Sequence, residues 1–414
     1  MRKTSLLTTL IGIVALFATG CSSEADERQD NGPKSRMEMN AEEEGISEAE
    51  IENAFAIFED MATALAPYQD NIVYSPLSKD LCLGMVANAL VDADRDRIVG
   101  KMGASSATAL NEFNKNRLNY FSYNAEKAKV FFANSIWANS RYVTSEQEFG
   151  TAAGVIKQYY DAECRILDFG STDVRTQIDK WCSEKTNGVI DYLGKTMSNV
   201  DRKLSVIIST MYFNCAWKQA LIGSNTATTK FYKADGVHER GLVKMMTDAK
   251  RTLQVVWEES FAAFEMHYAD CNYSAIFVLP DRDKTFFDIL PDVKEMLLAR
   301  KLDNVEPQDC SIGIPRFSES QYNDITGYMK NSGFNLDGCA LAGFDGGMLS
   351  DIRQAMSLTV TEAGTKAVAG TKHTGGSLAS PGTPIVLDRP FLMIIKDNNH
   401  GSILLMAAIQ MPKE

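Results

Sequence analysis

Histidine, cysteine and serine are among the residues that most often carry catalysis, but this sequence does not place them in a catalytic pattern. No pair of its four histidines has the i, i+4 spacing of a helical zinc site, and neither a G-x-S-x-G nor a G-x-x-x-x-G-K-[ST] motif occurs. The eight cysteines are widely spaced, without a C-x-x-C pair. We therefore expect no metal, no cofactor and no enzyme activity. The histidines are His238, His267, His373 and His400.

The segment that departs most from ordinary folding patterns is a polar, small-residue stretch at residues 362–384, which lies between apolar segments. Connections longer than about 15 residues are uncommon inside a compact domain and are usually functional or disordered. Small side chains occupy every second position from Thr365 to Thr371, whereas Lys366 and Lys372 fall on the alternate face. A passive loop would not need this order. The pattern predicts a latent strand, one side of which can enter a crowded core.

The elements around this segment predict an α+β protein with a predominantly antiparallel or mixed sheet core. Ser75-Pro76 opens one helix, and a second, centred on Ile178, ends at Asn187-Gly188. A capping box of Ser47 with Glu50 predicts that the first helix and the globule begin there. Apolar runs predict strands at residues 129–138, 204–213, 274–279, 357–361, 391–396 and 403–409.

The N-terminus predicts export and a lipid anchor. Arg2 and Lys3 precede a short apolar run that ends in small residues before Cys21, which resembles the lipobox of bacterial lipoproteins. The alternative is a plain secretory signal with an incidental cysteine. We expect residues 1–20 to be removed and Cys21 to be lipidated, which would attach the protein to the bacterial cell envelope. The acidic residues after Cys21 resemble surface-export signals of Gram-negative lipoproteins, so outer-membrane display is expected.

Composition limits the remaining classes of function. Residues 22–50 contain ten acidic and three basic side chains, and we expect residues 21–46 to form a solvated, flexible tether and residues 47–414 to form the globule. The whole chain of 414 residues is 45% hydrophobic and carries a net charge of -12. These values indicate an ordinary globular protein and argue against a nucleic-acid partner, which would require a basic surface.

From about residue 50 to the C-terminus the sequence resembles the serpins, the serine protease inhibitor family. The resemblance rests on short motifs in a characteristic order: residues 71–78 (Asn-Ile-Val-Tyr-Ser-Pro-Leu-Ser), 133–137 (Ala-Asn-Ser-Ile-Trp), 181–188 (Trp-Cys-Ser-Glu-Lys-Thr-Asn-Gly), Tyr212-Phe213 with Trp217, 277–280 (Phe-Val-Leu-Pro), 314–317 (Ile-Pro-Arg-Phe) and 388–392 (Asp-Arg-Pro-Phe-Leu). It implies one domain, with about nine helices around three β-sheets and an exposed reactive-centre loop at about residues 363–387.

The resemblance also implies a function and a set of site residues. A serine protease would cleave the loop near Leu378-Ala379, or at Ala379-Ser380, and the freed hinge would insert as a strand and trap the acyl-enzyme. Leu378 suits chymotrypsin-like, elastase-like or papain-type pockets, although it could also be only a surface leucine. The hinge residues are Glu362, Gly364, Thr365, Ala367 and Ala369. The shutter and breach residues, which lie beneath and at the top of the opening sheet, are Ser75, Ser78, Ser209, Trp217 and Gln354.

Three functions remain open from the sequence: an inhibitory serpin, a non-inhibitory serpin that serves as a binding or structural module, and an enzyme. The absence of catalytic motifs disfavours the enzyme. The small inward side chains of the hinge favour inhibition, because only insertion requires them. Gly370, Gly375, Gly376 and an inward His373 would make a poor strand, which keeps the second alternative open. The expected partners are serine or cysteine proteases and a membrane, and we expect a monomer.

Overall fold

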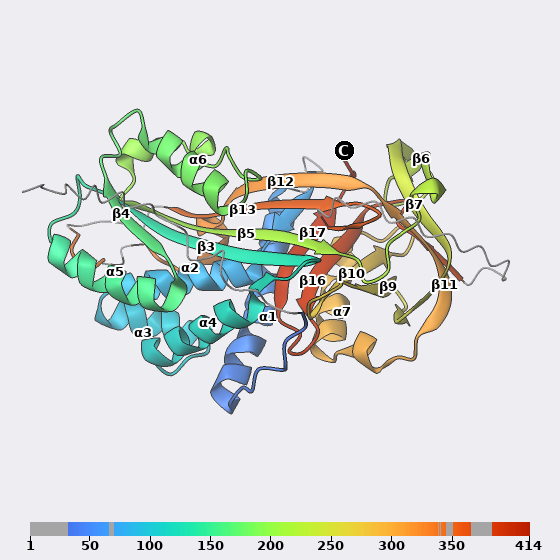
Figure 1. The fold of residues 1–414 in the computed structure, drawn as a ribbon, viewed down its shortest axis with the longest axis horizontal. Coiled ribbons are helices and arrows are strands. Elements are labelled where there is room, and N and C mark those ends of the chain that lie inside the picture. The colour runs from blue at the N-terminus through green and yellow to red at the C-terminus, as the bar shows by residue number, and fades with distance from the viewer. Residues whose placement is uncertain (1–31, 66–69, 338, 340, 345–350, 366–382) are drawn as a thin grey trace, which may run out of the picture.

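A computed structural model describes residues 32–65, 70–337, 339, 341–344, 351–365 and 383–414. It confirms the α+β fold with three β-sheets, and the described residues contain eight α-helices (Figure 1). The helices are α1 (Ala41–Leu65), α2 (Pro76–Ala89), α3 (Asp92–Lys101), α4 (Ala107–Phe121), α5 (Glu146–Tyr160), α6 (Val174–Lys185), α7 (Phe286–Leu298) and α8 (Thr326–Asn331).

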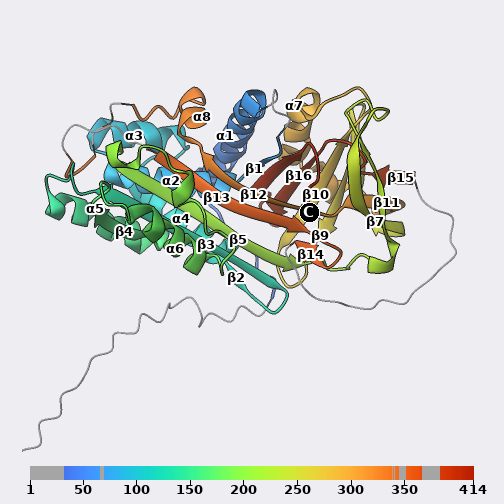
Figure 2. The same ribbon diagram turned by 90° about the horizontal axis from the view of Figure 1, so that it is seen from above.

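The largest sheet has seven strands and contains the hinge. Its order is β12-β13-β14-β5-β3-β2, and β4 pairs with β3. Most pairings are antiparallel, whereas β13 with β5 and β3 with β4 are parallel. Figure 2 shows β14 at one end of this long sheet, beside the end of β5. The strands are β2 (Tyr123–Asn124), β3 (Ala128–Asn139), β4 (Glu163–Leu167), β5 (Ser205–Ala216), β12 (Phe317–Asp324), β13 (Asp351–Val360) and β14 (Gly364–Thr365).

Helices cover both faces of this sheet, so its central strands are apolar on both sides. In Figure 1, α6 lies over one face and α2, α4 and α5 lie beneath the other. Successive residues of β5 alternate between two cores: Ile207 belongs to the main core, and Val206 and Ile208 belong to a second cluster that packs against α6. Because consecutive strand side chains point to opposite faces, the continuous apolar run in the sequence marks a strand buried on both sides.

The other two sheets complete the domain. One has six strands in the order β1-β17-β16-β10-β9-β8, and the other has four in the order β15-β11-β7-β6. The first consists of β1 (Ile72–Tyr74), β8 (Val255–Trp257), β9 (Phe261–His267), β10 (Tyr273–Pro280), β16 (Phe391–Asp397) and β17 (Ile403–Ile409). The second consists of β6 (Thr226–Tyr232), β7 (Glu239–Leu253), β11 (Gln308–Pro315) and β15 (Thr383–Val386).

The six predicted strands, the helix opened by Ser75-Pro76 and the helix centred on Ile178 are confirmed, and five of the strands differ from the prediction by three residues or fewer at each end. Ser75 caps α2, because its Oγ accepts a hydrogen bond of 3.1 Å from the Ser78 N–H. The positive φ angles of Asn187 and Gly188, 51° and 75°, follow the end of α6. The strand expected at residues 357–361 begins earlier, at Asp351. No helix among the described residues is long and apolar enough to cross a membrane.

The expected start of the globule at Ser47 is wrong for the first helix, which begins at Ala41. Asn40 is the cap: its Oδ1 accepts hydrogen bonds from the N–H groups of Glu42 and Glu43, and its own N–H donates to Glu43. Ser47 and Glu50 are instead buried within α1.

The expected solvated tether up to residue 46 is also wrong for its second half. The Lys34 Nζ donates to the backbone carbonyl of Asn119, and the Lys34 carbonyl accepts from the Asn272 side chain at 2.7 Å. Met37 and Met39 pack against the main core. Acidic composition suggested a solvated segment, but a few polar and methionine contacts hold residues 34–39 against the body.

Candidate functional site

The site lies where the seven-stranded sheet opens between β5 and β13. The two strands pair in parallel from Asp351 with Val206 to Met356 with Met211. Beyond Met356 and Met211, β14 lies between them and pairs antiparallel with both. The first two residues of the loop strand therefore already occupy the gap, which corrects the expectation that the hinge as a whole belongs to an exposed loop.

Thr365 is the innermost described residue of the hinge. Its side chain is fully buried, and its Oγ1 lies 2.6 Å from the Tyr268 Oη. Burial raises the pKa of Tyr268 well above its usual range, so the phenol stays protonated and can donate this hydrogen bond. The predicted inward orientation of Thr365 agrees with this geometry.

Trp217 holds the turn between β13 and β14. Its indole N–H donates to the Thr361 carbonyl at 3.0 Å, and its backbone N–H donates to the Ala363 carbonyl at 2.9 Å. The indole stacks on Tyr268 with ring centroids 4.5 Å apart and an interplanar angle of 13°. Trp217 and Tyr268 together connect the hinge to the six-stranded sheet, because Tyr268 follows β9.

Glu362 fixes the hinge from the other side through its backbone and its carboxylate. The Leu221 N–H donates to the Glu362 carbonyl at 2.8 Å. The carboxylate accepts hydrogen bonds from Thr226 and from the guanidinium of Arg316. Partial burial would raise the pKa of Glu362, but these two hydrogen bonds outweigh burial and lower it. Glu362 is therefore a charged anchor at neutral pH.

Two of the shutter residues, Gln354 of β13 and Ser75 before α2, meet where β5 and β13 are paired. The Gln354 Nε2 donates to the Ser75 carbonyl at 2.6 Å, and the Gln354 Oε1 accepts from the Ser75 N–H at 3.3 Å. The Ser75 Oγ donates to the Leu404 carbonyl at 2.7 Å. Gln354 thus ties β13 to the start of α2, which in turn contacts β17.

The hydroxyls of two predicted shutter residues take no part in this network. Ser209 is the direct strand neighbour of Gln354, yet the hydroxyls of Ser209 and Ser78 are buried without a hydrogen-bond partner among the described residues. An unpaired buried hydroxyl costs free energy and calls for an explanation. Ser209 belongs to the strand pair that would separate during insertion, and Ser78 lies in α2, which contacts β5.

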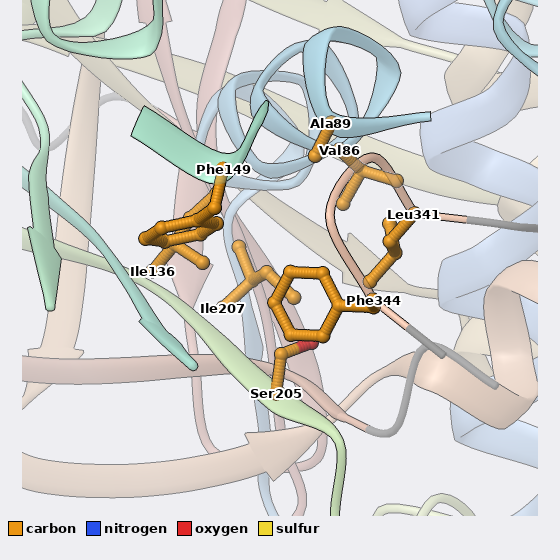
Figure 3. Close-up of a pocket in the computed structure, with 8 residues that line it drawn as sticks. All are labelled: Val86, Ala89, Ile136, Phe149, Ser205, Ile207, Leu341 and Phe344. Atoms are coloured by element: carbon orange, nitrogen blue, oxygen red, sulfur yellow. The ribbon is translucent and has the colours of Figure 1, made fainter. Parts of the chain in front are cut away.

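A small apolar cavity also lies on the α2 side of the sheet (Figure 3). Ser205 and Ile207 of β5, Phe149 of α5, and Leu341 and Phe344 are among its lining residues. Its volume is about 10 Å³, room for about one water molecule, and its walls are almost wholly apolar. It is too small to hold a ligand, and the strands that line it are β3, through Ile136, and β5.

Sequence reasoning identified only part of this site. Tyr268, Arg316 and Thr226 were not singled out, and only Arg316 falls in a family motif. Nothing in the local sequence marks Tyr268 and Thr226, because each reaches the hinge from another sheet or its edge, and the motif that contains Arg316 does not connect it with the hinge. Five of the expected residues, Cys21, Ala367, Ala369, Leu378 and Ala379, lie outside the described residues.

The described part of the chain contains no group of three or more side chains able to hold a metal ion. Its seven cysteines are free thiols: Cys82, Cys164, Cys182, Cys215, Cys271, Cys310 and Cys339. Burial raises the pKa of the Cys82 and Cys182 thiols, which makes them poor nucleophiles.

Comparison with known proteins identifies the family. The model of the family described as serpin (serine protease inhibitor) matches residues 48–412, and the chain therefore belongs to the serpin family. Human Serpin I2 is 24% identical over 361 residues, which cover 83% of this chain and 87% of that protein.

Solved structures show the same fold at low identity. Human kallistatin has a TM-score of 0.78 at 20% identity and covers 91% of this chain and 100% of its own. Human thyroxine-binding globulin, solved in complex with thyroxine, also has a TM-score of 0.78, at 18% identity, and covers 90% of this chain and 100% of its own. The fold alone therefore does not decide between protease inhibition and the binding of a small molecule.

Proposed function

We propose that this protein is a suicide inhibitor of serine proteases. A protease would cleave the loop at residues 363–387 near Leu378-Ala379, and the hinge would then insert between β5 and β13 before the acyl-enzyme hydrolyses. The observation that carries the proposal is the position of β14, which is already wedged between these strands and antiparallel to both. The hinge thus has both the site and the direction that insertion requires.

The register of β14 supports continued insertion. Thr365 pairs with Cys215 of β5 and with Val360 of β13. If this register continues, Ala369 would lie between Met211 and Met356, and Thr371 would lie between Ser209 and Gln354. These are the pairs that now face each other directly across β5 and β13. One inserted strand would therefore replace a parallel pairing with two antiparallel pairings.

The same register gives the unpaired shutter hydroxyls a role. Thr371 would share the face of Thr365, because the two residues are an even number of positions apart. Its hydroxyl would then arrive near Ser209, above Ser78. The free energy lost by burying these hydroxyls in the native protein would be recovered on insertion.

The protease would carry out the covalent chemistry, and strand insertion in the inhibitor would supply the free energy that distorts the protease. The protease serine attacks the Leu378 carbonyl, an ester forms, and Ala379 leaves with a new amino terminus. About ten inserted residues, each gaining ladder hydrogen bonds worth roughly 0.5 to 1.5 kcal/mol, would supply on the order of 10 kcal/mol to distort the bound protease. Leucine on the acyl side favours chymotrypsin-like or elastase-like proteases, and papain-like cysteine proteases accept it as well.

A second candidate is a non-inhibitory serpin that serves as a binding or structural module. It is favoured by the structural likeness to thyroxine-binding globulin and by the glycines and inward His373 in the loop strand. In this case cleavage of the loop would yield a nicked protein and free protease.

One experiment separates the two candidates. The protein is incubated with a panel of serine and cysteine proteases, and the products are examined for a covalent complex that survives boiling in detergent. Inhibition predicts such a band with a chymotrypsin-like or elastase-like enzyme, and no band when the protease serine has been blocked beforehand. A panel that yields only nicked protein would reject the proposal in favour of the binding module.

For location, we propose that Cys21 is lipidated and attaches a monomeric inhibitor to the bacterial cell envelope. Support comes from the sequence pattern around Cys21. Two acyl chains, at about 0.8 kcal/mol for each buried methylene, are sufficient to hold a soluble domain at a membrane.

A further inference from the structure

Two cysteines lie side by side next to the hinge, on segments that are far apart in the sequence. Cys215 belongs to β5, where it pairs with Thr365 of β14, and Cys271 lies in the turn between β9 and β10. Burial raises the pKa of the Cys215 thiol well above its usual range, and the neighbouring Cys271 thiol raises it further. Neither thiol has a part in the proposed inhibition.

The backbone holds the two segments together. The end of β5 continues into an antiparallel bridge between Trp217 and Tyr268. Beside this bridge, the Ala269 N–H donates to the Ala216 carbonyl at 2.8 Å. Ala216 directly follows the first cysteine, and Ala269 precedes the second by two positions. The two backbones are therefore fixed next to each other before any bond joins the sulfur atoms.

Aromatic contacts show that the Cys215 side chain lies on the face of β5 that meets this turn. The ring centroid of Phe213 lies 5.1 Å from that of Tyr268 and 5.8 Å from that of Tyr273, the residues at the two ends of the turn. Cys215 shares the face of Phe213, because strand side chains two positions apart point the same way. Burial is the main reason that the pKa of both tyrosines rises, and the Cys215 and Cys271 thiols are among the further causes.

The turn that contains Cys271 is held by its own hydrogen bonds. The Tyr268 N–H donates to the Tyr273 carbonyl at 2.9 Å, and the Asn398 N–H donates to the Asn272 carbonyl at 2.7 Å. A disulfide does not tolerate widely separated Cα atoms. Two fixed backbones side by side meet this condition without a rearrangement of the fold.

The two thiols differ in their access to solvent. Cys271 is 7% exposed, whereas Cys215 is 0% exposed. A single buried cysteine usually serves as a small apolar filler. Here a reagent in the solvent can reach one thiol, and a second thiol lies next to it within the core. This is the arrangement of an attacking thiol and a resolving thiol.

We propose that Cys215 and Cys271 are a dithiol that an external disulfide converts to a disulfide bond. The Cys271 thiolate would attack one sulfur of the external disulfide, which forms a mixed disulfide and releases one thiol. The Cys215 thiolate would then attack the Cys271 sulfur and displace the second thiol. In sum, the two protein thiols lose two electrons and two protons, and the external disulfide gains them.

The new bond would join β5 to the six-stranded sheet where Trp217 and Tyr268 hold the hinge. If the hinge inserts as proposed above, this end of β5 would stay in place while β5 and β13 separate further along. An exported protein meets the oxidising conditions in which disulfides persist. The thiol chemistry itself depends neither on export nor on protease inhibition.

The test treats the reduced, intact protein with 2,2′-dithiodipyridine, a small aromatic disulfide. The remaining thiols are alkylated, and tryptic peptides are analysed by mass spectrometry without reduction. Residues 204–218 and 252–282 form two tryptic peptides that contain one cysteine each. We expect a species that joins these two peptides and lacks two hydrogen atoms. The melting temperature should rise by about 4 °C, because the bond restricts the unfolded chain.

Variants distinguish the attacking thiol from the resolving thiol. Cys215→Ala should stop the reaction at the mixed disulfide, so that Cys271 keeps a pyridylthio group that the wild type loses. Cys271→Ala should leave Cys215 unmodified. Cys164→Ala is the matched control, because Cys164 is a partly buried thiol on β4, at the other end of the sheet from β14 (Figure 2). It should form the joined peptides and show the rise in melting temperature.

Three results would overturn the proposal: no joined peptides in the wild type although Cys164 reacts, a pyridylthio group that persists on Cys271 in the wild type, or joined peptides that pair either cysteine with a different partner. If Cys215→Ala does not fold, as judged by circular dichroism, Cys271→Ala replaces it. That variant must lose both the joined peptides and the rise in melting temperature. Because no protease is used, failure of this proposal and failure of the proposed function are separate results.

Discussion

If the protein is the protease inhibitor proposed above, Thr365→Arg should convert it into a protease substrate. In the native protein Thr365 has 0% of its surface exposed and is hydrogen-bonded to Tyr268, between β5 and β13. An arginine at this position must either enter the sheet as a charge or keep the hinge outside. Burying a charge without a partner costs several kcal/mol even after the surroundings relax. The hinge should therefore stay out of the sheet.

The size of the effect follows from the competition between insertion and deacylation. If the transition state of insertion bears about 3 kcal/mol of the burial cost, insertion slows more than about 100-fold, because 1.36 kcal/mol corresponds to a tenfold change in rate. Suppose the wild type traps about 20 protease molecules for each one it releases. The number of inhibitor molecules consumed per protease trapped would then rise from about 1 to about 9.

The assay titrates a fixed amount of a chymotrypsin-like protease with inhibitor and measures the residual activity and the ratio of covalent complex to nicked protein. Thr365→Ser is the matched control, because it keeps a hydroxyl for Tyr268 and should preserve the wild-type stoichiometry. Trp217 emission gives a second measurement before any protease is added. It should change in Thr365→Arg, because Trp217 hydrogen-bonds to Thr361 and Ala363 of the hinge.

Unchanged stoichiometry in Thr365→Arg would refute the reasoning. Equal thermal stability of intact and loop-cleaved wild type would refute it independently, since an inserted strand must stabilise the sheet. If Thr365→Ser raises the number of inhibitor molecules consumed per protease trapped as much as Thr365→Arg does, the position tolerates no change at all. In that case the effect could not be assigned to the buried charge.

The other predictions concern specificity, location and pH. Leu378→Arg should move inhibition toward trypsin-like proteases. If the protease preference is unchanged and the loop is cleaved at another bond, the reactive bond is not Leu378-Ala379. Cys21→Ser should release the protein from the membrane fraction, and a wild type that is already soluble contradicts the anchor. Burial raises the pKa of Glu50 to about 7, against the opposing effect of Arg117. The folded state therefore binds the proton of the Glu50 carboxyl more tightly than the unfolded state does. The contribution of this proton to the free energy of unfolding is complete below about pH 4.5 and is lost as the pH rises through 7. The melting temperature of the wild type should fall between pH 5 and 8, and Glu50→Gln should show a smaller fall. An identical pH dependence in the two proteins would contradict this role of Glu50.

Much of the fold could be predicted because apolar runs mark strands that are buried on both faces. Residues 403–409 were predicted to the residue as β17, and β3 to within one residue at each end. The start of β13 was missed because its first residues are polar. Arg353 is buried through an ion pair with Asp351 at 2.9 Å, and Gln354 is buried through its bonds to Ser75. Hydropathy does not reveal burial that depends on partners elsewhere in the chain.

The candidate site was predicted in part, for a related reason. Glu362, Thr365 and Trp217 were identified from their place in the resemblance, and the structure brings them together. Their direct partners Tyr268 and Arg316 lie far away in the sequence. A tyrosine with ordinary neighbours gives no signal of its own, and the motif around Arg316 does not show that it contacts Glu362. The short insertion of β14 was likewise missed. It depends on a gap between two distant strands, which no local pattern encodes.

The docking of residues 34–39 sets a length scale for the anchored protein. If Cys21 carries lipid, thirteen residue steps separate it from Lys34, the first docked residue, and they reach at most about 45 Å. A tether that was free up to residue 46 would reach about 90 Å by the same measure. This short tether would keep the reactive-centre loop in a thin layer above the membrane. The inhibitor would then act on proteases that approach the membrane to which it is attached, and not on proteases in the surrounding fluid.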